Sequence, residues 1–481
     1  MAASTKEEPL SPGSRLFQAP RLNLHIIVIM GSKTKINASV IKAGLEQTLI
    51  KHPRFSSKLA STFFSSLLRW IPTKVNIEDH VIVPELDLEM DSPNQFVEDY
   101  ISNLTTMPMD ISKPLWEVHI LNVKTSEADA VGVLRIHHSI GDGVSLMSLL
   151  LACTRKTSNP EALPTLPVQN RKSTSSVSGG FWSFFVIWST LRIFFNTIVN
   201  IVVFMATILF LKDSKSPIYG TPGIEHNPKR FVHKTFCLND IKLVKNAMNM
   251  TVNDVLTGVT QADLSRYLNR IYANEYEKDG VQKQKANNLP KRIRLTAIIL
   301  VNTRPTAGIQ ALADMMAKNS KANWGSQIGY IIVPFTIALQ DDPVDYVRGA
   351  KTIVDRKKQS LEVTFTSQLA NFVQKTFGDK AAAALLHRVV SNTTLAFSNM
   401  VGPQEEIIFY GHTLAYIAPS VYGHPHALTI HVQSYINNLT ICLAVDPSLI
   451  PDPHQLCADF EESLNIIKNA VLEKGLIKEI A

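Results

Sequence analysis

The sequence lacks the short motifs that mark several large enzyme classes. It contains no G-x-S-x-G elbow of a serine hydrolase, no phosphate-binding P-loop and no G-x-G-x-x-G of a dinucleotide enzyme. No zinc-finger or aromatic RNA-binding motif is present either. The sequence therefore gives no support to serine hydrolysis, nucleotide hydrolysis, nicotinamide-dependent chemistry or nucleic-acid binding.

Cysteine is scarce, since the 481 residues include only Cys153, Cys237, Cys442 and Cys457. None forms a C-x-x-C pair, and each lies in an apolar-periodic stretch, so we expect four reduced thiols in the core. Residues 1–20 lack the apolar stretch of a secretory signal. We therefore expect the active part of the chain to face the cytosol.

Charged residues are also few, at 19% of the chain, and the net charge is +7. The basic residues are mostly dispersed among acids, and the one cluster, "KRIR" at 291–294, is typical of a solvated loop. Anionic lipid headgroups or a phosphorylated small substrate fit this charge at least as well as nucleic acid does.

The hydrophobic content of 45% indicates a folded protein, and the length exceeds one simple core. Strand-like runs alternate with helical patterns in both halves, so the fold class is α/β in the mixed α+β sense. A stretch rich in Pro, Ser, Thr and Gly at 156–180 is typical of a linker. We place an N-terminal half at 1–165, a linker at 166–225 and a C-terminal half at 226–481.

The longest apolar run is Phe181 to Leu211, which is long enough to span a bilayer. Polar residues near multiples of 3.6 form one narrow stripe of this predicted helix. They are Ser189, Arg192, Asn196, Asn200 and Thr207. The run therefore predicts either a transmembrane helix or a helix lying in the membrane interface.

Residues 135–143, "RIHHSIGDG", carry the sharpest pattern in the chain. A hairpin is predicted before the pair His137–His138, and a helix begins at Gly143, so Asp142 stands at the helix entry. A neutral imidazole at His138 can take a proton from a hydroxyl or thiol near pH 7. Without such a role, the stretch is simply a strand that ends in a glycine-rich turn.

A metal site is the competing chemical interpretation of the pair. Adjacent residues on a strand point to opposite faces, so His137 and His138 cannot readily bind one ion together. The other histidine cluster, "HPHALTIH" at 424–431, is typical of a loop leading into a strand. We therefore expect no metal.

"HHSIGDG" resembles the HHxxxDG signature of coenzyme A-dependent acyltransferases with the chloramphenicol-acetyltransferase-like fold. The whole chain is similar to the plant wax ester synthase/diacylglycerol acyltransferase family. The C-terminal DFGWG of plant alcohol acyltransferases is absent, and Ser326 stands where many relatives have Asn. The supporting segments are "EPLSPGSRLF", "KPLWEVHIL", "TVNDVLTG", "VNTRP", "WGSQIGYIIVP" and "FSNMVGP".

The resemblance implies two chloramphenicol-acetyltransferase-like subdomains with the active site at their interface. It implies transfer of a long-chain acyl group from acyl-CoA to a fatty alcohol, giving a wax ester, or to diacylglycerol, giving triacylglycerol. His138 would be the general base, and no covalent acyl-enzyme is needed. We expect no cofactor beyond the acyl-CoA substrate and no obligate protein partner.

The resemblance also assigns roles to particular residues. The catalytic set is His138, His137, Asp142 and Gly143, with Asp142 structural and paired to Arg304. A surface arginine is the alternative for Arg304, and helix capping or turn formation is the alternative for the "TVND" and "SNMVG" segments. The residues expected to bind substrate are Asn253, Asp254, Ser398, Asn399 and Trp116.

Location follows from the same resemblance. A single span at 181–211 would put the two halves of the active site on opposite sides of the bilayer. We therefore expect a monotopic or re-entrant helix on the cytosolic face of the endoplasmic reticulum, with the plasma membrane as a second location. Two alternatives are a non-catalytic acyl-CoA or lipid-binding protein on the same fold and an amide-forming condensation domain, although no carrier-domain neighbours are present.

Overall fold

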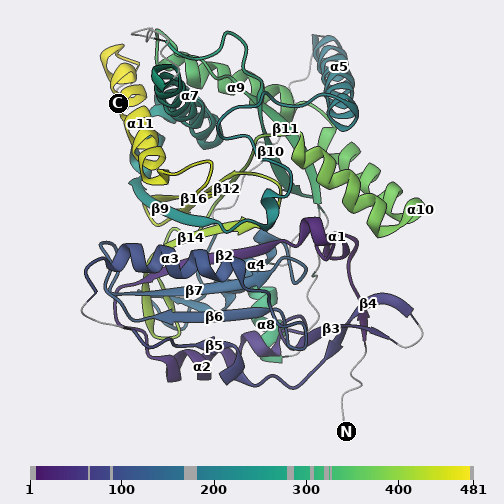
Figure 1. Cartoon of the computed structure of the whole chain (residues 1–481), viewed down its shortest axis with the longest axis vertical. Helices are drawn as coiled ribbons and strands as arrows, with labels where there is room; N and C mark the ends of the chain where they lie inside the picture. Colours follow the sequence, from purple (N-terminus) through teal and green to yellow (C-terminus); the bar gives the residue numbers. More distant parts are fainter. Residues whose placement is uncertain are drawn as a thin grey trace.

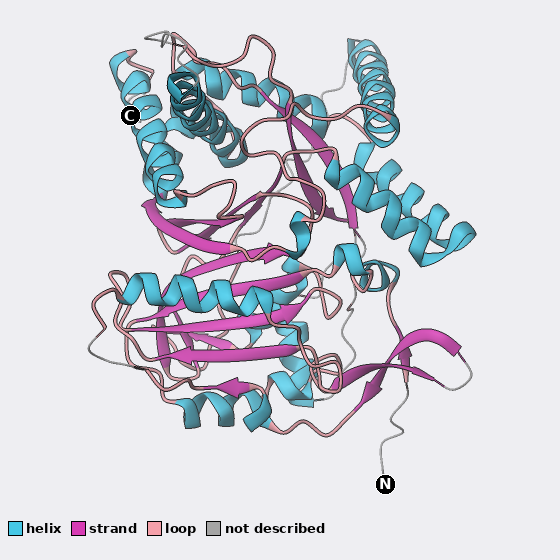
Figure 2. Ribbon diagram, viewed as in Figure 1, coloured by secondary structure: helices cyan, strands magenta, loops and turns pink. Residues whose placement is uncertain are grey.

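The protein is described here from a computed structural model (Figure 1). It describes residues 7–62, 65–86, 90–166, 181–278, 287–303, 308–318, 324 and 328–476. Two large sheets lie one above the other in Figure 2, and helices cover their outer faces. The fold is mixed α and β, as the sequence predicts.

The first sheet has seven strands in the order β5-β6-β7-β2-β14-β13-β8. The predicted hairpin is present, because β6 and β7 pair antiparallel. Two of its strands come from the C-terminal half of the chain, which the sequence did not predict. The bounds are β2 (His25–Ser32), β5 (Val81–Ile82), β6 (Trp116–Leu121), β7 (Ala130–His137), β8 (Thr154–Lys156), β13 (Ile407–Phe409) and β14 (His412–Tyr422).

Strand β2 is central because both of its faces are buried. Ile26 and Val28 point into a core shared with three helices, while Ile27 and Ile29 point into a second core beneath α3. The sheet is therefore a layer between two sets of helices. These are α3 (Pro93–Thr106) on one face and α2 (Ala38–Gln47), α4 (Gly143–Ala152) and α8 (Ile309–Lys318) on the other.

The second sheet has six strands in the order β11-β10-β12-β15-β16-β9. Four helices share one large core with it: α6 (Leu238–Ala247), α7 (Val252–Lys278), α9 (Val344–Lys358) and α11 (Pro453–Glu473). The strands are β9 (Arg230–Cys237), β10 (Leu295–Asn302), β11 (Ile328–Phe335), β12 (Leu395–Met400), β15 (Leu428–Tyr435) and β16 (Asn438–Val445).

The helices α5 (Phe181–Leu209) and α10 (Glu362–Ser391) pack together at the β10–β11 edge of this sheet (Figure 1). Asn196 Nδ2 of α5 donates to the carbonyl of Gln359 at 3.2 Å, and Asn392 Nδ2 donates to the carbonyl of Thr207 at 2.7 Å. Residues 186–209 are long and apolar enough to cross a membrane, by length and composition.

The polar stripe expected along this helix is divided between two surroundings. Asn196, Asn200 and Thr207 are buried against the protein, whereas Ser189 and Arg192 are exposed. The helix therefore turns the second half of its polar stripe to the protein and leaves an apolar face outward.

Shorter elements complete the fold. The helix α1 (Pro12–Leu16) lies beside α10, and the hydroxyl of Ser14 donates to the carbonyl of Ser139 at 2.7 Å, so the N-terminal segment braces the histidine loop. A small sheet has the order β1-β4-β3, with β1 (Glu8–Pro9), β3 (Ser57–Thr62) and β4 (Ser65–Pro72). Single 3₁₀ turns are η1 (Pro20–Leu22), η2 (Leu49–Lys51), η3 (Ile77–Asp79) and η4 (Ile224–His226).

The cysteine prediction is correct for three residues and wrong for the fourth. Cys153, Cys442 and Cys457 are buried free thiols, but Cys237 is exposed. The reason is its place at the end of β9, where it precedes α6 as the N-cap residue. The domain bounds expected from the sequence stay a prediction.

Candidate active site

The histidine pair lies where a strand of the first sheet ends. Strand β7 finishes at His137, and the backbone N–H of His138 donates to the carbonyl of Leu24 at 2.8 Å. The chain then turns into α4, whose N-cap is Asp142. A carboxylate oxygen of Asp142 accepts from the backbone N–H of Ser145 at 2.9 Å, which satisfies one of the free donors of the first helical turn.

His137 is held on both ring nitrogens by the protein. Its Nδ1 faces two donors, the Gln18 side-chain amide at 3.1 Å and the Ser139 backbone N–H at 3.2 Å. The proton of the neutral ring is therefore on Nε2, which donates to Asn23 Oδ1 at 2.8 Å. Burial and the neighbouring His25 lower the pKa of His137, so this neutral form is the stable one. Its ring holds the loop in place.

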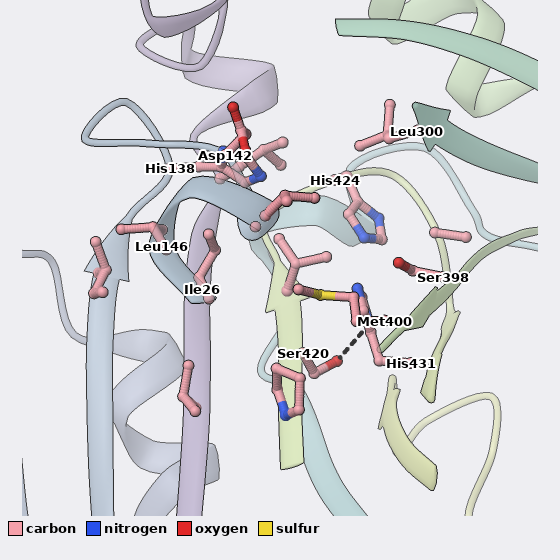
Figure 3. A pocket seen from close by; sticks show the side chains of 18 of the residues that line it. Ile26, His138, Asp142, Leu146, Leu300, Ser398, Met400, Ser420, His424 and His431 are labelled. Carbon is pink, nitrogen blue, oxygen red and sulfur yellow. Dashed lines mark hydrogen bonds between the residues drawn. The ribbon is translucent and has the colours of Figure 1, made fainter. Parts of the chain in front are cut away.

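His138 points the other way, as alternation along the strand requires. It lies in the wall of a cavity of about 240 Å³ between the two halves of the molecule (Figure 3). Its ring centroid is 4.4 Å from that of Phe17. Burial lowers the pKa of His138, while its own main-chain carbonyl and the Asp142 carboxylate oppose that shift. The imidazole is therefore neutral at neutral pH and able to accept a proton.

The two halves supply different surfaces to this cavity. The first half contributes mainly aliphatic side chains, and these continue from the histidine into the space between the sheet and α4. Such a lining suits a long acyl or alkyl chain. The aliphatic residues are Ile26, Val28, Leu134, Ile136, Leu146, Met147 and Leu150.

The second half contributes apolar side chains as well, among them Phe397, Met400 and Val421, but it also adds polar groups from β12, β14, β15 and the connection between the last two. Ser398 and Asn399 of β12, two of the residues expected to bind substrate, line the cavity, and their role in binding stays a prediction. We call the remaining set the histidine wall, and its members are Ser420, His424, His426 and His431. Figure 3 shows Ser420, His424 and His431 of this set.

Sequence reasoning missed the histidine wall. The signal was present, because three histidines fall within eight residues at 424–431. A loop that leads into a strand is the ordinary interpretation of that pattern, and only the pairing of β14 with the first sheet brings the loop to the cavity.

Asn253 and Asp254 are not among the described residues that line the cavity. Asn399 Nδ2 donates to Asn253 Oδ1 at 2.5 Å, so Asn253 positions a residue that does line the cavity. Asp254 caps α7, since its carboxylate accepts from the Thr251 backbone N–H at 2.8 Å while its own N–H donates to the Thr251 hydroxyl at 3.3 Å. The capping alternative therefore describes Asp254.

Trp116 requires a correction, because the structure places it in the core of the first half and not in the cavity wall. Its side chain is fully buried and stacks on His80, and its indole N–H donates to the carbonyl of Phe55 at 2.9 Å. The proposed partner of Asp142, Arg304, and the unusual Ser326 both lie outside the described residues.

Gly143 lines the cavity at the first turn of α4. A Cβ built there would stand 3.6 Å from the sulfur of Met400, an ordinary contact. Among the described residues, no group of three or more His, Cys, Asp and Glu side chains is placed to hold a metal ion.

Comparison with known families places this geometry in context. The sequence matches the wax ester synthase/diacylglycerol acyltransferase catalytic domain over residues 30–256 and the WS/DGAT C-terminal domain over residues 324–468. Wax ester synthase/diacylglycerol acyltransferase 11 of Arabidopsis thaliana is 54% identical over 478 residues, covering 98% of this chain and 97% of that protein. Wax ester synthase/diacylglycerol acyltransferase 5 of the same plant is 54% identical over 484 residues, covering 98% and 95%.

Solved structures support the fold. The wax ester synthase/diacylglycerol acyltransferase from Marinobacter aquaeolei VT8 superimposes with a TM-score of 0.58 at 17% identity, covering 96% of this chain and 99% of that one. The first condensation domain of the calcium-dependent antibiotic synthetase gives a TM-score of 0.55 at 10% identity, covering 97% of each chain.

Proposed function

This chain belongs to the wax ester synthase/diacylglycerol acyltransferase family, and from that premise we propose how its cavity carries out acyl transfer. The protein is an acyl-CoA-dependent O-acyltransferase that makes wax esters, triacylglycerols or both. The observation that carries the proposal is His138, a buried, neutral imidazole in the cavity that both halves line.

His138 accepts the proton of the acceptor hydroxyl as the oxygen attacks the thioester carbonyl. The carbon–sulfur bond then breaks, CoA leaves as thiolate, and the proton held by His138 passes to it to give the thiol. The aliphatic wall of the first half holds the long chains and keeps water from the thioester. Apart from His138, the scheme uses only the two substrates and requires no cofactor.

The neighbouring residues act on position and not on the reacting atoms. Asp142 fixes the start of α4 and with it the turn that follows His138. We keep Arg304 as its proposed cationic partner. Ser398 and Asn399 are proposed to contact substrate, and Asn253 to hold Asn399 in place.

The reaction is tested with the purified full-length protein, radiolabelled palmitoyl-CoA and either hexadecanol or a diacylglycerol. We expect labelled wax ester, labelled triacylglycerol or both, with release of one CoA per ester formed. Binding of acyl-CoA without formation of any ester would instead support the alternative, a non-catalytic lipid-binding protein on the same fold.

The outward face of α5 is proposed to rest on a membrane. It exposes many large apolar side chains, interrupted near its start by Ser189, Thr190 and Arg192, and Phe372 and Phe377 of the adjoining α10 are exposed as well. The inner side of α10 contributes Leu386 and Val390 to the cavity, so lipid at this surface is close to the reaction site. The exposed α5 residues are Val186, Ile187, Trp188, Leu191, Phe194, Phe195, Ile198, Val202, Met205 and Leu209.

We propose that this association is monotopic and on the cytosolic face of the endoplasmic reticulum, with the plasma membrane as a second location. Hydrogen bonds tie α5 to the body at Asn196 and Thr207, which favours a helix that lies along the protein. Tags at Ala2 and Ala481 are expected to be equally accessible to protease in sealed microsomes. Tags on opposite sides of an active monomer would establish a single span instead.

A matched pair of variants tests the surface itself. Phe194→Ser with Phe195→Ser should shift the protein from pelleted membranes to the supernatant. Ile111→Ser, which changes an exposed apolar residue far from α5 in sequence, should leave the distribution unchanged. An equal shift in both proteins would contradict a specific role for α5.

A further inference from the structure

Three histidines that the acyl-transfer scheme does not use line the same cavity as His138. His424 and His426 lie in the connection between β14 and β15, and His431 lies in β15. Figure 3 shows His424 and His431 on the side of the cavity opposite His138 and Asp142. Each ring is surrounded by protein, yet each reaches the cavity.

The hydrogen bonds of these rings are incomplete. His424 Nε2 shares a hydrogen bond with the Thr429 hydroxyl at 3.1 Å, and His426 Nε2 shares one with the Thr393 hydroxyl at 2.9 Å. Within the described part of the chain, the Nδ1 atoms of both rings are buried without a hydrogen-bond partner. Buried polar groups are almost always paired, so these two nitrogens are unused hydrogen-bonding atoms in the histidine wall.

The third ring completes the wall. His431 Nδ1 shares a hydrogen bond with the Ser420 hydroxyl at 3.2 Å, and part of the ring surface stays open to the cavity. In each imidazole of the histidine wall, one ring nitrogen thus shares a hydrogen bond with a hydroxyl group of the protein. The Thr393 hydroxyl donates to the carbonyl of Val390 at 2.8 Å, so it accepts from His426 Nε2 and leaves His426 Nδ1 as an acceptor. The Thr429 and Ser420 hydroxyls can donate or accept, so His424 and His431 can each carry the ring proton on the other nitrogen.

The charge of the wall limits what it can bind. Burial lowers the pKa of His426 to about 3 and that of His431 to about 4, and the pKa of His424 is lowered by burial and by neighbouring charges that include Lys229. All three rings are therefore neutral at neutral pH. A neutral imidazole donates one hydrogen bond and accepts one, which suits an uncharged ester or hydroxyl oxygen better than a carboxylate or phosphate.

We propose that His424 and His431 of the histidine wall donate hydrogen bonds to the ester oxygens of an acylglycerol acceptor, while the free hydroxyl of that acceptor lies at His138. The His426 ring, with its centroid 5.1 Å from that of His424, holds His424 in position. This inference rests on the proposed function. A fatty alcohol has a single oxygen, which His138 uses. A diacylglycerol has the same hydroxyl and, a few bonds away, two ester groups whose oxygens reach the polar side of the cavity. The wall therefore sets the preference for acylglycerol over fatty alcohol.

The test is a competition in one tube between hexadecanol and 1,2-dioleoylglycerol for labelled palmitoyl-CoA. The ratio of triacylglycerol to wax ester does not depend on how much of a variant is folded. In His424→Leu the ratio should fall about three- to tenfold, the effect of one neutral hydrogen bond. The ratio should also fall in His426→Leu. In His424→Gln, which keeps a donor and an acceptor, most of the wild-type ratio should be recovered.

His233→Leu is the matched control. His233 lies in β9, burial lowers its pKa to about 4, and it lines a separate cavity beside Tyr416 on the other face of β2. Its substitution should leave the product ratio unchanged. If His424→Leu yields no active protein, the His424→Gln and His426→Leu ratios decide.

Several results would overturn the inference. An unchanged ratio in the His424 and His426 variants would do so, as would an equal loss of both products, which would place the wall on the acyl donor that both reactions share. A wild-type protein that makes wax ester and no triacylglycerol would contradict the inference and leave the proposed function intact. A wild-type protein that makes neither product would contradict the proposed function itself.

Discussion

Two histidine-containing loops, 135–143 in the first half and 424–431 in the second, face the same cavity. The sequence of the first loop predicts a functional role, whereas the sequence of the second does not. In the first loop the residues that matter are close in sequence, and alternation along β7 separates a structural His137 from a cavity-facing His138. In the second loop nothing local distinguishes the histidines from core residues. Functional residues that are close in sequence can be recognised from their spacing. Functional residues that a strand from the other half brings to the cavity cannot be recognised in this way.

That strand is β14, and it connects the two loops directly. Its last residue, Tyr422, pairs with His25 of β2, which in turn pairs with His137. The His25 ring stacks on Tyr422 with centroids 5.0 Å apart and meets the edge of His137 at 4.9 Å. The chain then turns at Gly423 and enters the histidine wall.

Gly423 shows why this turn depends on sequence. Its φ is +93°, and a Cβ there would stand 2.2 Å from the carbonyl oxygen of Asn23. Asn23 also accepts the hydrogen bond from His137. One glycine therefore allows the second loop to pass close to the backbone that holds the first.

The sharpest test of the difference within the first loop is His138→Ala, with His137→Ala as the matched variant. Loss of the general base should lower kcat by about 10² to 10⁴. His137→Ala removes a ring that holds the loop, so it should act mainly on thermal stability and leave most of kcat in the folded fraction. Steady-state kinetics with far-UV circular dichroism separates the two effects. Equal turnover in the two variants would show that alternation along β7 does not divide their roles.

The pH dependence of the wild type gives the next largest effect. Burial lowers the pKa of His138 below 6.5, so the base stays deprotonated at pH 6.5 and is protonated only at lower pH. We expect kcat/KM to hold constant down through pH 6.5 and to fall tenfold per pH unit below the pKa of His138. A fall in kcat/KM with a midpoint above pH 6.5 would contradict a lowered pKa for His138.

Stability must be followed in the same pH series. Burial lowers the pKa values of His25 and His52 to about 3 in the folded protein. The unfolded chain takes up protons at these rings below about pH 6.5, so folding stability falls as pH decreases from there toward pH 3. Melting temperatures measured at each pH show which part of an activity loss is unfolding.

Asp142 tests how much of the first loop depends on the cap of α4. Asp142→Ala removes the acceptor for the Ser145 backbone N–H, which should cost about 0.5 to 2 kcal/mol of stability. Asp142→Asn keeps a capping oxygen and loses the charge, so its difference from wild type isolates the charge and its difference from Asp142→Ala isolates the capping oxygen. Urea unfolding measures both. An Asn variant that is as stable as wild type but inactive would make Asp142 a catalytic residue.

The predictions that succeeded depend on local pattern. The hairpin β6–β7, the helix after Gly143 and the place of Asp142 at its N-cap follow from periodicity, turn residues and capping preference. The resemblance of "HHSIGDG" supplied the function. Asn253 and Asp254 were correctly placed at a helix start, but the sequence could not say which of them would approach the cavity.

The predictions that failed required knowledge of long-range packing. Cys237 follows a stretch in which apolar and polar residues are mixed, and it is the exposed last residue of an edge strand. Strands β13 and β14 cross into the first sheet, a pairing between segments hundreds of residues apart that no local pattern encodes. Without that pairing, 424–431 is simply a connection between two strands.

The smallest expected effect is that of a substitution at Trp116. This residue lies in one of the segments that resemble the family, yet its side chain points into the core. Trp116→Phe removes the hydrogen bond from its indole to the Phe55 carbonyl and leaves that buried oxygen unpaired, which should cost about 1 kcal/mol of stability. Because the ring lies among core residues and outside the described cavity lining, the KM values for acyl-CoA and for either acceptor should stay within twofold of wild type. Thermal unfolding and steady-state kinetics on the same preparation check the two statements. A rise in KM without loss of stability would return Trp116 to the substrate-binding set and show that the segment around it reaches the cavity after all.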